Sequence, residues 1–265
     1  MLFFCLIFFC FPATAMEAPW ETPVFRAPLA AYDAPREEPS VAPAPQNVSA
    51  PKIALVIDDL GVKKKMTAAF MTLPAPVTLS FFPFSPDFDE QATAAKRAGH
   101  TVFLHVPMES LNGETEAMML QTDDDDEALK GETDAVLTAV SGYEGVNNHM
   151  GSRFTADERA MRVFLTALKE KGLPFLDSMT TPLSVAGDVA ARTGVFYVAR
   201  DVFIDNIAER PAINVQLELL AQKASEKGFA VGIAHPHQAT LDVLKRWIPK
   251  AKKDGFEFVS VLSVK

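Results

Sequence analysis

Short, continuously apolar runs alternate with amphipathic stretches along residues 52–265. The runs have the length of strands, as in Ile53–Ile57, Thr101–His105 and Phe229–Ala234. The stretches between them have helical spacing, and Ala156–Lys171 is one that should end at the following glycine. Strands that are apolar throughout are typical of parallel strands buried on both faces. The pattern predicts an α/β fold, which is either a doubly wound sheet or a β/α barrel.

The lack of a phosphate-binding loop helps to choose between these two folds. No G-x-G-x-x-G motif follows the first apolar run, and the chain has no P-loop sequence. We therefore expect a single β/α barrel of about seven to eight parallel strands over residues 52–265. In this barrel we expect Thr122 to cap a helix that continues to about Val140, and Glu257–Leu262 to form the last strand.

The first fifteen residues have the pattern of a signal peptide. Leu2–Phe11 is an unbroken apolar run, and Ala13-Thr14-Ala15 has the form of a cleavage site. The run is shorter than the roughly 20 residues that a membrane-spanning helix needs, although no Lys or Arg precedes it. We expect residues 1–15 to be removed and the mature chain to be exported, periplasmic or associated with the cell envelope, without a membrane span. The alternative interpretation is a buried N-terminal strand.

Residues 16–51 connect this segment to the predicted barrel. They hold eight prolines and eight alanines and lack a helical or strand-like apolar period, which is typical of an extended, semi-rigid linker. Both cysteines of the chain, Cys5 and Cys10, lie before the linker. The domain at residues 52–265 is therefore not a disulfide scaffold, and it has neither a thiolate zinc site nor a cysteine nucleophile.

The charge of the chain argues against nucleic acid as a partner. The chain carries 25 Lys and Arg against 34 Asp and Glu, a formal net charge of −9. Its one basic run, Lys63-Lys64-Lys65, is short, whereas phosphate binding needs clustered Lys and Arg. The sequence leaves the oligomeric state open.

Polar residues directly follow several of the apolar runs. In parallel α/β folds the functional side chains lie just past the carboxyl ends of the strands, so these residues are candidates for a site. They are Asp58, Asp59, His105, Glu109, Asn147, Asn148, His149, Asp177, Asp201, Asp205, His235 and His237. His100 precedes its apolar run, so we expect it at the opposite end of the barrel, in a structural role.

Carboxylates and imidazoles dominate this set. A tandem Asp often only caps a helix, and a lone His at a strand end is more often structural. Here, however, three of the chain's five histidines would converge with carboxylates on one barrel mouth. Buried charges at this density need a cation or one another to offset desolvation. Because Asp, Glu and His ligands suit Zn²⁺ or a similar ion, the sequence predicts a divalent metal site, with zinc as the expected ion.

Several motifs resemble those of one enzyme family. The segment IDDLG (57–61) is similar to the first motif of the polysaccharide deacetylases with the NodB-homology fold, and AGHTVFLHVPME (98–109) is similar to their second motif. HVPME, GVNNHMGSRFTAD, LDSMTT, DVFIDN and GIAHPH together resemble the divergent polysaccharide deacetylase family. The resemblance covers nearly all of residues 52–265, and its most specific part is GVNNHMGS (145–152).

The resemblance implies a NodB-like β/α barrel that removes acetyl groups from N-acetylated sugars with the help of a metal ion. It implies that Asp58 is the general base and that Asp59 and His105 are metal ligands. His235 stands in the position of the family's Leu-x-His motif and would protonate the leaving amine. Glu109 is a departure, because it stands where the parent family, the deacetylases with the NodB-homology fold, has a second histidine ligand.

A second departure lies in the segment NNHMG, which replaces the family's Arg-Pro-Pro-Tyr-Gly loop. It removes an Arg and introduces His149. Either Glu109 or His149 can supply the third metal ligand, and the sequence does not choose between them. The substrate contacts expected around the mouth are Asn147, Asn148, Met150, Asp177, Asp201 and Asp205.

These departures leave two functions open. The first is a metal-dependent deacetylase that acts on an acetylated envelope or extracellular polysaccharide, with the glycan undetermined. The second is a catalytically weak or inactive barrel that binds glycan or a cell-envelope partner. A metal amidohydrolase of another class is less favoured, because such barrels usually carry a His-x-His pair after the first strand, where this chain has Asp58-Asp59.

Overall fold

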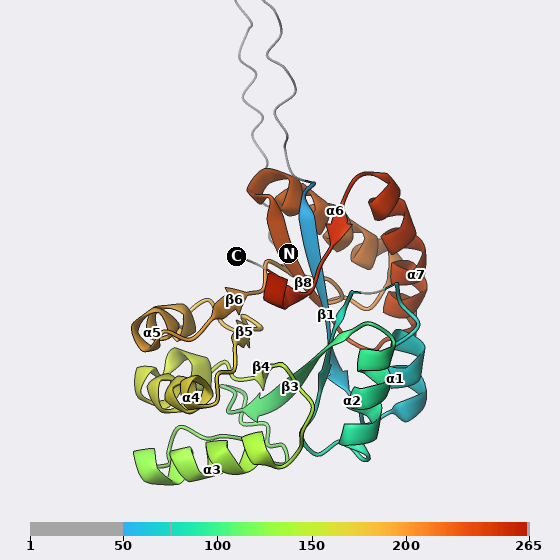
Figure 1. The fold of residues 1–265 in the computed structure, drawn as a ribbon. Coiled ribbons are helices and arrows are strands. Elements are labelled where there is room, and N and C mark those ends of the chain that lie inside the picture. Colours follow the sequence, from blue (N-terminus) through green and yellow to red (C-terminus); the bar gives the residue numbers. More distant parts are fainter. Residues whose placement is uncertain (1–49, 75, 264–265) are drawn as a thin grey trace, which may run out of the picture. The chain divides into compact units, whose positions relative to one another are not determined.

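The structure, a computed structural model, describes residues 50–74 and 76–263 (Figure 1). The predicted signal peptide and nearly all of the predicted linker lie outside the described residues. The strands of the described part are β1 (Lys52–Leu60), β2 (Thr78–Phe81), β3 (Thr101–Met108), β4 (Gly145–Met150), β5 (Phe175–Asp177), β6 (Tyr197–Ala199), β7 (Val202–Phe203), β8 (Phe229–Ala234) and β9 (Glu257–Phe258). The helices are α1 (Lys64–Phe70), α2 (Phe88–Arg97), α3 (Asp126–Thr138), α4 (Glu158–Glu170), α5 (Ala186–Thr193), α6 (Arg210–Lys227) and α7 (Gln238–Lys253). Two 3₁₀ turns, Phe154–Ala156 and Val261–Ser263, complete them.

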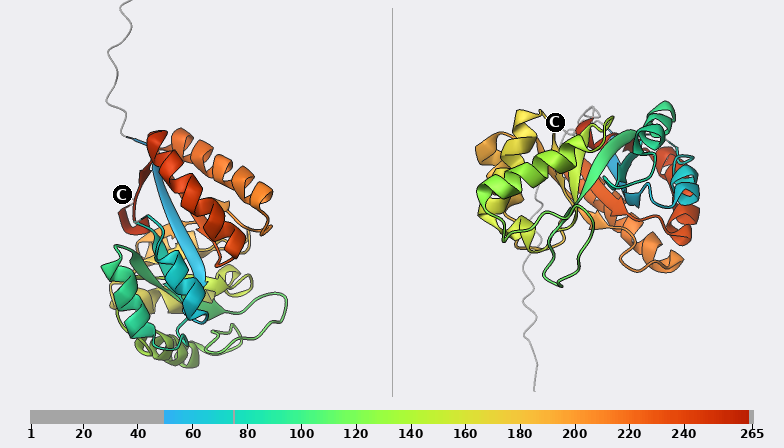
Figure 2. Two further views of the ribbon diagram at one scale, coloured as in Figure 1. Left: turned by 90° about the vertical axis from the view of Figure 1, so that its right-hand side faces the viewer. Right: turned by 90° about the horizontal axis from the view of Figure 1, so that it is seen from below.

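The strands form one parallel sheet whose order follows the chain around a curl. The order is β6-β5-β4-β3-β2-β1-β8-β7, and β9 pairs with β1. In the described part of the chain the circle is interrupted between β6 and β7, which lie at the two ends of this order. The helices lie along the outer face of the curled sheet (Figures 1 and 2). The prediction of a single β/α barrel with seven to eight parallel strands is therefore confirmed, with the barrel open at one seam.

Side chains of each strand alternate between two apolar layers, as the two-residue period of a strand requires. On β1, Ile53, Leu55 and Ile57 belong to the large core between the sheet and the helices. Ala54 and Val56 belong instead to a smaller cluster inside the curl, together with Phe103, Leu176, Val231, Ile233 and Val261. The strands are thus buried on both faces, which explains why their sequences are apolar throughout.

Two element predictions were wrong. The chain after Phe258 turns into the 3₁₀ segment Val261–Ser263 instead of continuing as a strand to Leu262. β9 pairs with β1 only at Lys52 and Ile53, since β2 takes up the same edge of β1 from Val56 onward. The pairing edge of β1 that remains for β9 is therefore short, and β9 is only two residues long.

The other wrong prediction concerns the start of α3. The N-cap is Asp125, whose side chain accepts a hydrogen bond of 2.9 Å from the Ala128 N–H, and the helix ends at Thr138. Thr122 lies one turn earlier and donates its hydroxyl to Glu109.

Among the described residues no helix is long and apolar enough to cross a membrane.

Candidate active site

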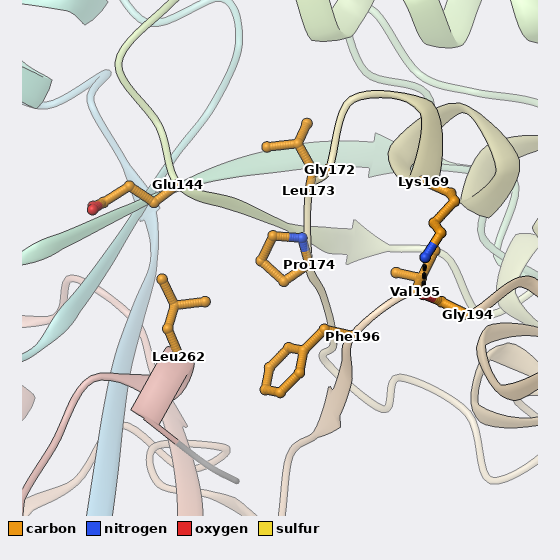
Figure 3. Close-up of a pocket in the computed structure, with 9 residues that line it drawn as sticks. All are labelled: Glu144, Lys169, Gly172, Leu173, Pro174, Gly194, Val195, Phe196 and Leu262. Atoms are coloured by element: carbon orange, nitrogen blue, oxygen red, sulfur yellow. Dashed lines mark hydrogen bonds between the residues drawn. The ribbon is translucent and has the colours of Figure 1, made fainter.

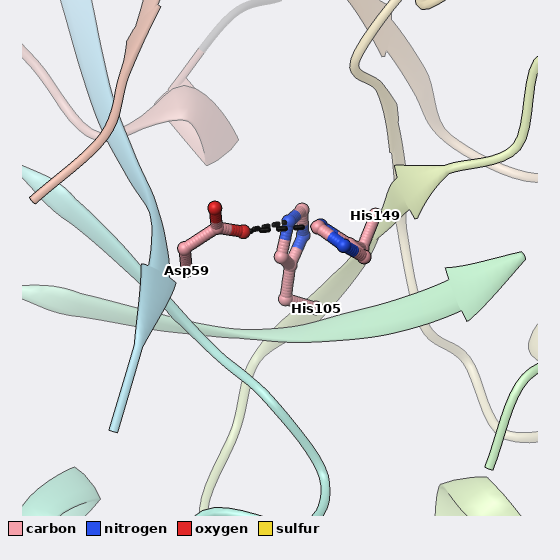
Figure 4. Close-up of side chains that lie close together, drawn as sticks. All are labelled: Asp59, His105 and His149. Carbon is pink, nitrogen blue, oxygen red and sulfur yellow. Dashed lines mark ion pairs between the residues drawn. The ribbon is translucent and has the colours of Figure 1, made fainter. Parts of the chain in front are cut away.

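Three side chains from three strands meet at the carboxyl end of the sheet. The Asp59 Oδ1 atom lies 3.0 Å from His149 Nδ1 and 3.2 Å from His105 Nε2. The three ligand atoms lie within 4.8 Å of one another, and the side chains point toward a common space (Figure 4). Asp59 comes from β1, His105 from β3 and His149 from β4.

The alternation of the strands explains why these residues face inward. Asp58 continues the inward-facing row of Ala54 and Val56 on β1, and His105 follows the inward-facing Phe103 on β3. His235, directly after β8, follows Val231 and Ile233 in the same way. Apolar side chains thus fill the inside of the curled sheet, and polar side chains occupy the inward-facing positions at the carboxyl ends of the strands.

Asp59 breaks the alternation of β1. Its φ of 56° is left-handed, and the pairing of β1 with β2 shifts register between Ile57 and Leu60. Asp is among the few residue types that tolerate this backbone region, and such strain often occurs at functional sites. The turn allows two adjacent carboxylates to approach one site, although a regular strand would send them to opposite faces.

Two neighbouring cavities occupy the mouth of the barrel. The outer cleft, of about 670 Å³, is lined by Asp59 and Phe84 among others. The inner chamber, of about 210 Å³, is lined by Asp58 and Arg200 among others. The side chains that line both are His149, Phe203 and His235.

The donors around Asp59 fit a bound cation. Oδ1 of Asp59 is buried and has no hydrogen-bond partner among the described residues, although two imidazole nitrogens lie beside it. Burial by itself would raise the pKa of Asp59, but the imidazoles of His105 and His149 lower it below its ordinary value. One ionised carboxylate and two imidazoles are the ligand types of catalytic zinc sites, which use three protein ligands.

His235 lines both cavities and is held by Asp205. Its Nδ1 lies 2.9 Å from Asp205 Oδ1, and its backbone N–H donates to Asp205 Oδ2 at 2.7 Å. The Thr240 hydroxyl donates to the same Oδ2 at 2.7 Å. Burial opposes protonation, but the hydrogen bond to Asp205 and the nearby carboxylates raise the pKa of His235 above its ordinary value. Asp205, which we expected to contact substrate, thus orients His235.

Comparison with known protein families assigns the chain to one of them. The sequence model of the family described as divergent polysaccharide deacetylase matches residues 55–264. The chain belongs to the divergent polysaccharide deacetylase family.

Two bacterial proteins are relatives of this deacetylase-family chain. It is 33% identical over 206 residues to the protein of Escherichia coli (strain K12) named Uncharacterized protein YibQ, which covers 76% of this chain and 63% of that one. It is 32% identical over 204 residues to an Uncharacterized protein of Haemophilus influenzae (strain ATCC 51907 / DSM 11121 / KW20 / Rd), covering 77% of this chain and 73% of the relative. The chain therefore spans less than two thirds of the E. coli relative.

A solved structure shares the fold. The crystal structure of the uncharacterized protein ATU2773 from Agrobacterium tumefaciens C58 superposes with a TM-score of 0.78 at 24% identity, covering 82% of this chain and 89% of that chain. The extent of both overlaps shows that the whole barrel is shared.

Glu109, the other candidate for the third ligand, lies away from the three-residue group. Its Oε2 accepts hydrogen bonds from the Thr122 N–H at 2.8 Å and the Thr122 hydroxyl at 2.6 Å, and its Oε1 accepts from Arg153 Nη1 at 2.7 Å. β3 has ended at Met108, and the Glu109 N–H bonds to the Leu120 carbonyl. Glu109 therefore closes the base of the long loop between β3 and α3, which extends from the barrel in Figure 2. Of the two alternatives that the sequence left open, the structure brings His149 to Asp59 and does not bring Glu109.

Two other acidic candidates have structural partners. Asp177 accepts hydrogen bonds from the Ser184 hydroxyl at 2.6 Å and the Tyr197 hydroxyl at 3.2 Å. Asp201 accepts from the Val231 N–H at 2.9 Å and from Lys227 Nζ at 2.7 Å. Neither residue lines the outer cleft or the inner chamber. The structure therefore does not bring Asp177 and Asp201 to the mouth.

Two further candidate residues of the NNHMG segment, Asn148 and Met150, border the inner chamber. Asn148 Nδ2 donates to the Met150 carbonyl at 2.7 Å. Asn148 Oδ1 accepts from the Ser178 N–H at 2.8 Å, which ties β4 to the end of β5. Met150 has a left-handed φ of 54°, like Asp59 at the end of β1.

Aromatic residues of the mouth are absent from the predicted set. Phe82 lies with its ring centroid 4.8 Å from that of His149 and 5.4 Å from that of His105. Phe84 stacks on Phe82 at 4.9 Å and lines the outer cleft. Both phenylalanines follow the end of β2. The search for polar residues after strand ends misses them because they are apolar, although their position in the sequence is the same.

The opposite end of the barrel, at the amino ends of the strands, carries none of the residues that line the outer cleft or the inner chamber. His100 lies there, and its Nε2 contacts the Met71 carbonyl at 2.9 Å. A cavity of about 420 Å³ opens at the same end, where Glu144, Pro174 and Phe196 precede β4, β5 and β6 (Figure 3). Its lining is largely apolar, and the Lys169 ammonium beside it donates to the Gly194 carbonyl at 2.7 Å. The candidate metal ligands and the candidate acid and base therefore lie at the carboxyl ends of the strands.

Proposed function

We propose that this protein is a metal-dependent hydrolase that removes acetyl groups from N-acetylated sugars of an envelope or extracellular polysaccharide. One observation carries the proposal. Asp59, His105 and His149 direct three metal-ligating atoms at one space, and a further carboxylate, Asp58, lies beside them without joining the group. This separates a set of ligands from a free base.

A divalent ion, with zinc as the expected one, would be held by Asp59 Oδ1, His105 Nε2 and His149 Nδ1. When bound, such an ion polarises a carbonyl oxygen and makes a water molecule more acidic. The protein's own groups then have to position the acetamide, accept a proton and supply one.

Asp58 is placed to accept the proton of the attacking water. It is 1% exposed, and it lines the inner chamber rather than the outer cleft. Its Oδ1 accepts a hydrogen bond of 2.8 Å from Asn147 Nδ2, and its Oδ2 lies 3.8 Å from His105 Nε2. The carboxylate is thereby directed at the space beside the ligand atoms.

His235 is placed to protonate the leaving amine. It borders both cavities, so it can reach a scissile bond held between them. Asp205 binds its Nδ1 and keeps the imidazole protonated to higher pH than usual. A general acid must be protonated when it acts, and a raised pKa favours this form of His235.

The two cavities divide the substrate. The inner chamber has the apolar side chains Met150, Phe203 and Ile233 in its lining, which suit the methyl group of an acetamide. The outer cleft, lined by Phe84, Asn206 and His237 among others, has room for the sugar ring. Met150 lines the chamber, and its backbone N–H is our candidate donor to the carbonyl oxygen.

A second function, a barrel that binds glycan or an envelope partner without catalysis, is favoured by one observation. Glu109 stands where the NodB-homology deacetylases that the sequence resembles have a histidine ligand, and it is engaged with Thr122 and Arg153 instead. The ligand set therefore differs from the family pattern even where the fold agrees.

Acetate release decides between the two functions. The purified chain, loaded with zinc, is incubated with N-acetylated oligosaccharides of peptidoglycan or chitin type, and free acetate is measured. We expect release that stops on chelation and returns when zinc is added back. Glycan binding without acetate release by the zinc-loaded chain would favour the binding barrel.

A further inference from the structure

Arg200 brings a positive charge to the inner chamber, although the proposed reaction gives it no role. It directly follows β6, and it lines the chamber together with Asp58 and Ile233 among others. It does not line the outer cleft. Its guanidinium carbon lies over the Phe203 ring, 5.3 Å from the ring centroid. The inner chamber thus has a guanidinium group beside its apolar lining.

A tight turn after β5 holds the Arg200 side chain in place. Its Nε–H donates to the Ser178 carbonyl and its Nη2–H to the Met179 carbonyl, each at 2.7 Å. The Met179 backbone is left-handed, with a φ of 51°, and its N–H donates to Asp177 Oδ1 at 2.8 Å. The backbone N–H of Arg200 donates to the Asp177 carbonyl at 3.0 Å. The orientation of the guanidinium is therefore determined before any ligand binds.

These bonds use only part of the guanidinium of Arg200. An arginine carries five N–H groups in a planar fork, and here two of them donate to backbone carbonyls. The other N–H groups, on Nη1 and Nη2, have no acceptor within residues 50–74 and 76–263. Nη1 is not sealed from solvent. The guanidinium can therefore donate to a ligand in the chamber without giving up its bonds to the turn.

No carboxylate of the described residues forms an ion pair with Arg200. Burial lowers the pKa of its guanidinium, and the more distant charges of Asp177 and Asp58 offset this only in part. Other arginines of the chain do pair with Asp or Glu, namely Arg153, Arg159, Arg162, Arg192 and Arg210. Arg200 is thus a partly desolvated cation without a bound counter-charge, and an anion would relieve the cost of this state.

We propose that the inner chamber is a binding site for a small carboxylate, which accepts hydrogen bonds from the free N–H groups of Arg200. A guanidinium can bind both oxygens of a carboxylate in parallel, so the fork matches this anion. The apolar part of the ligand would contact Met150, Phe203 and Ile233. The chamber volume of about 210 Å³ admits only a small group. Asp58 lines the same chamber, so the carboxylate must face Arg200 and not Asp58.

Two compounds can supply such a carboxylate. One is acetate, because hydrolysis of an acetamide adds water across the C–N bond, and the amine then leaves protonated while the acyl group leaves as acetate. The other is a carboxylate that the glycan carries beside its acetamide. The binding site follows from the protein's own contacts, whereas the choice between these two sources rests on the proposed function.

The first test compares acetate with acetamide, which has nearly the same size but no charge. ¹⁵N NMR of the metal-free chain at pH 7 follows the Arg200 Nε–H signal while each compound is added. The metal is left out because zinc itself binds carboxylates. We expect acetate to bind about 10–100-fold more tightly than acetamide, the range of a hydrogen bond to a charged group. Equal affinities in the wild type would overturn the proposal, and this comparison needs no variant.

A pair of variants assigns the preference to Arg200. Arg200→Met removes the N–H groups but keeps a long apolar side chain, and it should bind acetate and acetamide alike. Arg192→Met is the matched control, because Arg192 pairs with Glu158 at 2.7 Å and lines neither cavity. It should prefer acetate as the wild type does. A folded Arg200→Met chain that still prefers acetate would contradict the assignment.

Two sugars that differ by one carboxylate identify the source of the ligand. N-Acetylmuramic acid is N-acetylglucosamine with an added lactyl ether, so both carry the same acetamide. If the glycan supplies the carboxylate, the wild type should bind N-acetylmuramic acid about 10–100-fold more tightly, and Arg200→Met should bind both alike. If the ligand is the released acetate, the two sugars should bind alike. Added acetate should then inhibit amine formation by the zinc-loaded wild type more strongly than by Arg200→Met.

The outcomes separate this proposal from the proposed function. Sugars that bind alike, together with acetate inhibition that is the same in Arg200→Met, would overturn the carboxylate site. Preferential binding of acetate by a zinc-loaded chain that deacetylates no glycan would support the carboxylate site and contradict the hydrolase.

Discussion

Asp58 and Asp59 are adjacent in the chain, yet they line different cavities. Asp58 lines the inner chamber and is 1% exposed, whereas the Asp59 side chain is 31% exposed and lines the outer cleft. The left-handed backbone of Asp59 brings its carboxylate to the same barrel mouth as that of Asp58, but into the neighbouring cavity. The two carboxylates therefore have different neighbours, and we expect them to have different roles.

Substitution of each Asp by Asn should separate these roles. Asp58→Asn is nearly isosteric and should keep the fold and the zinc while acetate release falls by about 10²–10⁴-fold, because the general base is lost. Asp59→Asn should instead lower zinc affinity. Zinc content and acetate release, measured on the same preparations, check both outcomes. Loss of zinc from Asp58→Asn, with activity restored by added zinc, would mean that the roles are reversed.

The third ligand is tested by a pair of variants. His149→Ala should remove most of the bound zinc, since His149 Nδ1 lies 3.0 Å from Asp59 Oδ1. Glu109→Gln should keep it, because Glu109 is engaged with Thr122 and Arg153. The zinc-to-protein ratio after dialysis is the measurement. Full zinc content in His149→Ala together with its loss in Glu109→Gln would assign the ligand to Glu109.

Glu109 should matter for stability rather than for metal binding. Burial opposes its ionisation, but Thr122 and Arg153 lower the pKa of Glu109 below its ordinary value of 4.5. A lowered folded-state pKa stabilises the fold above the unfolded value, and this stabilisation is lost as the pH falls through the folded-state pKa. Glu109→Gln should cost about 1–3 kcal/mol at neutral pH and less in acid. Urea unfolding at the two pH values measures the difference, and an equal cost at both would contradict this role.

The pH profile of acetate release should depend on Asp205. His235 must be protonated to act as an acid, so activity falls as the pH rises through its pKa. Asp205 raises this pKa, so Asp205→Asn should shift the basic limb of kcat/KM to lower pH. The contribution of the His235–Asp205 pair to the free energy of unfolding changes with pH in the same direction as the activity. It is present at low pH and is lost as the pH rises through the folded-state pKa of His235. An unshifted basic limb in Asp205→Asn would show that another group is the acid.

Export is tested at the N-terminus. If residues 1–15 are a signal peptide, the protein in the envelope or periplasmic fraction should begin near Met16 and contain neither Cys5 nor Cys10. N-terminal sequencing and intact mass of protein from fractionated cells provide the measurement. A chain that retains Met1 in the cytosolic fraction would contradict this prediction.

The fold was predictable because its signals are local. Most apolar runs, such as Phe229–Ala234, are buried strands of the sheet, and the polar residue after such a run lies at the carboxyl end of the strand. This rule located Asp58, His105 and His235 from spacing alone.

The rest of the site depends on contacts that spacing does not encode. The choice of His149 over Glu109 depends on where the chain turns after Met108, which the bonds of Glu109 to Leu120 and Thr122 determine. The position of Asn147 after an apolar run predicts a substrate contact, but the structure buries it against Asp58 and Ser178, which are distant in sequence. Asp201 follows a strand end, but Lys227 and Val231 take up its carboxylate.

Anomalous diffraction at the zinc edge, on crystals of the chain grown with zinc, tests the central claim most directly. We predict one zinc peak at about 2.0–2.2 Å from Asp59 Oδ1, His105 Nε2 and His149 Nδ1, with a coordination position open toward Asp58. No peak at this site, or a zinc ion whose four positions are all filled by protein ligands, would contradict the hydrolase.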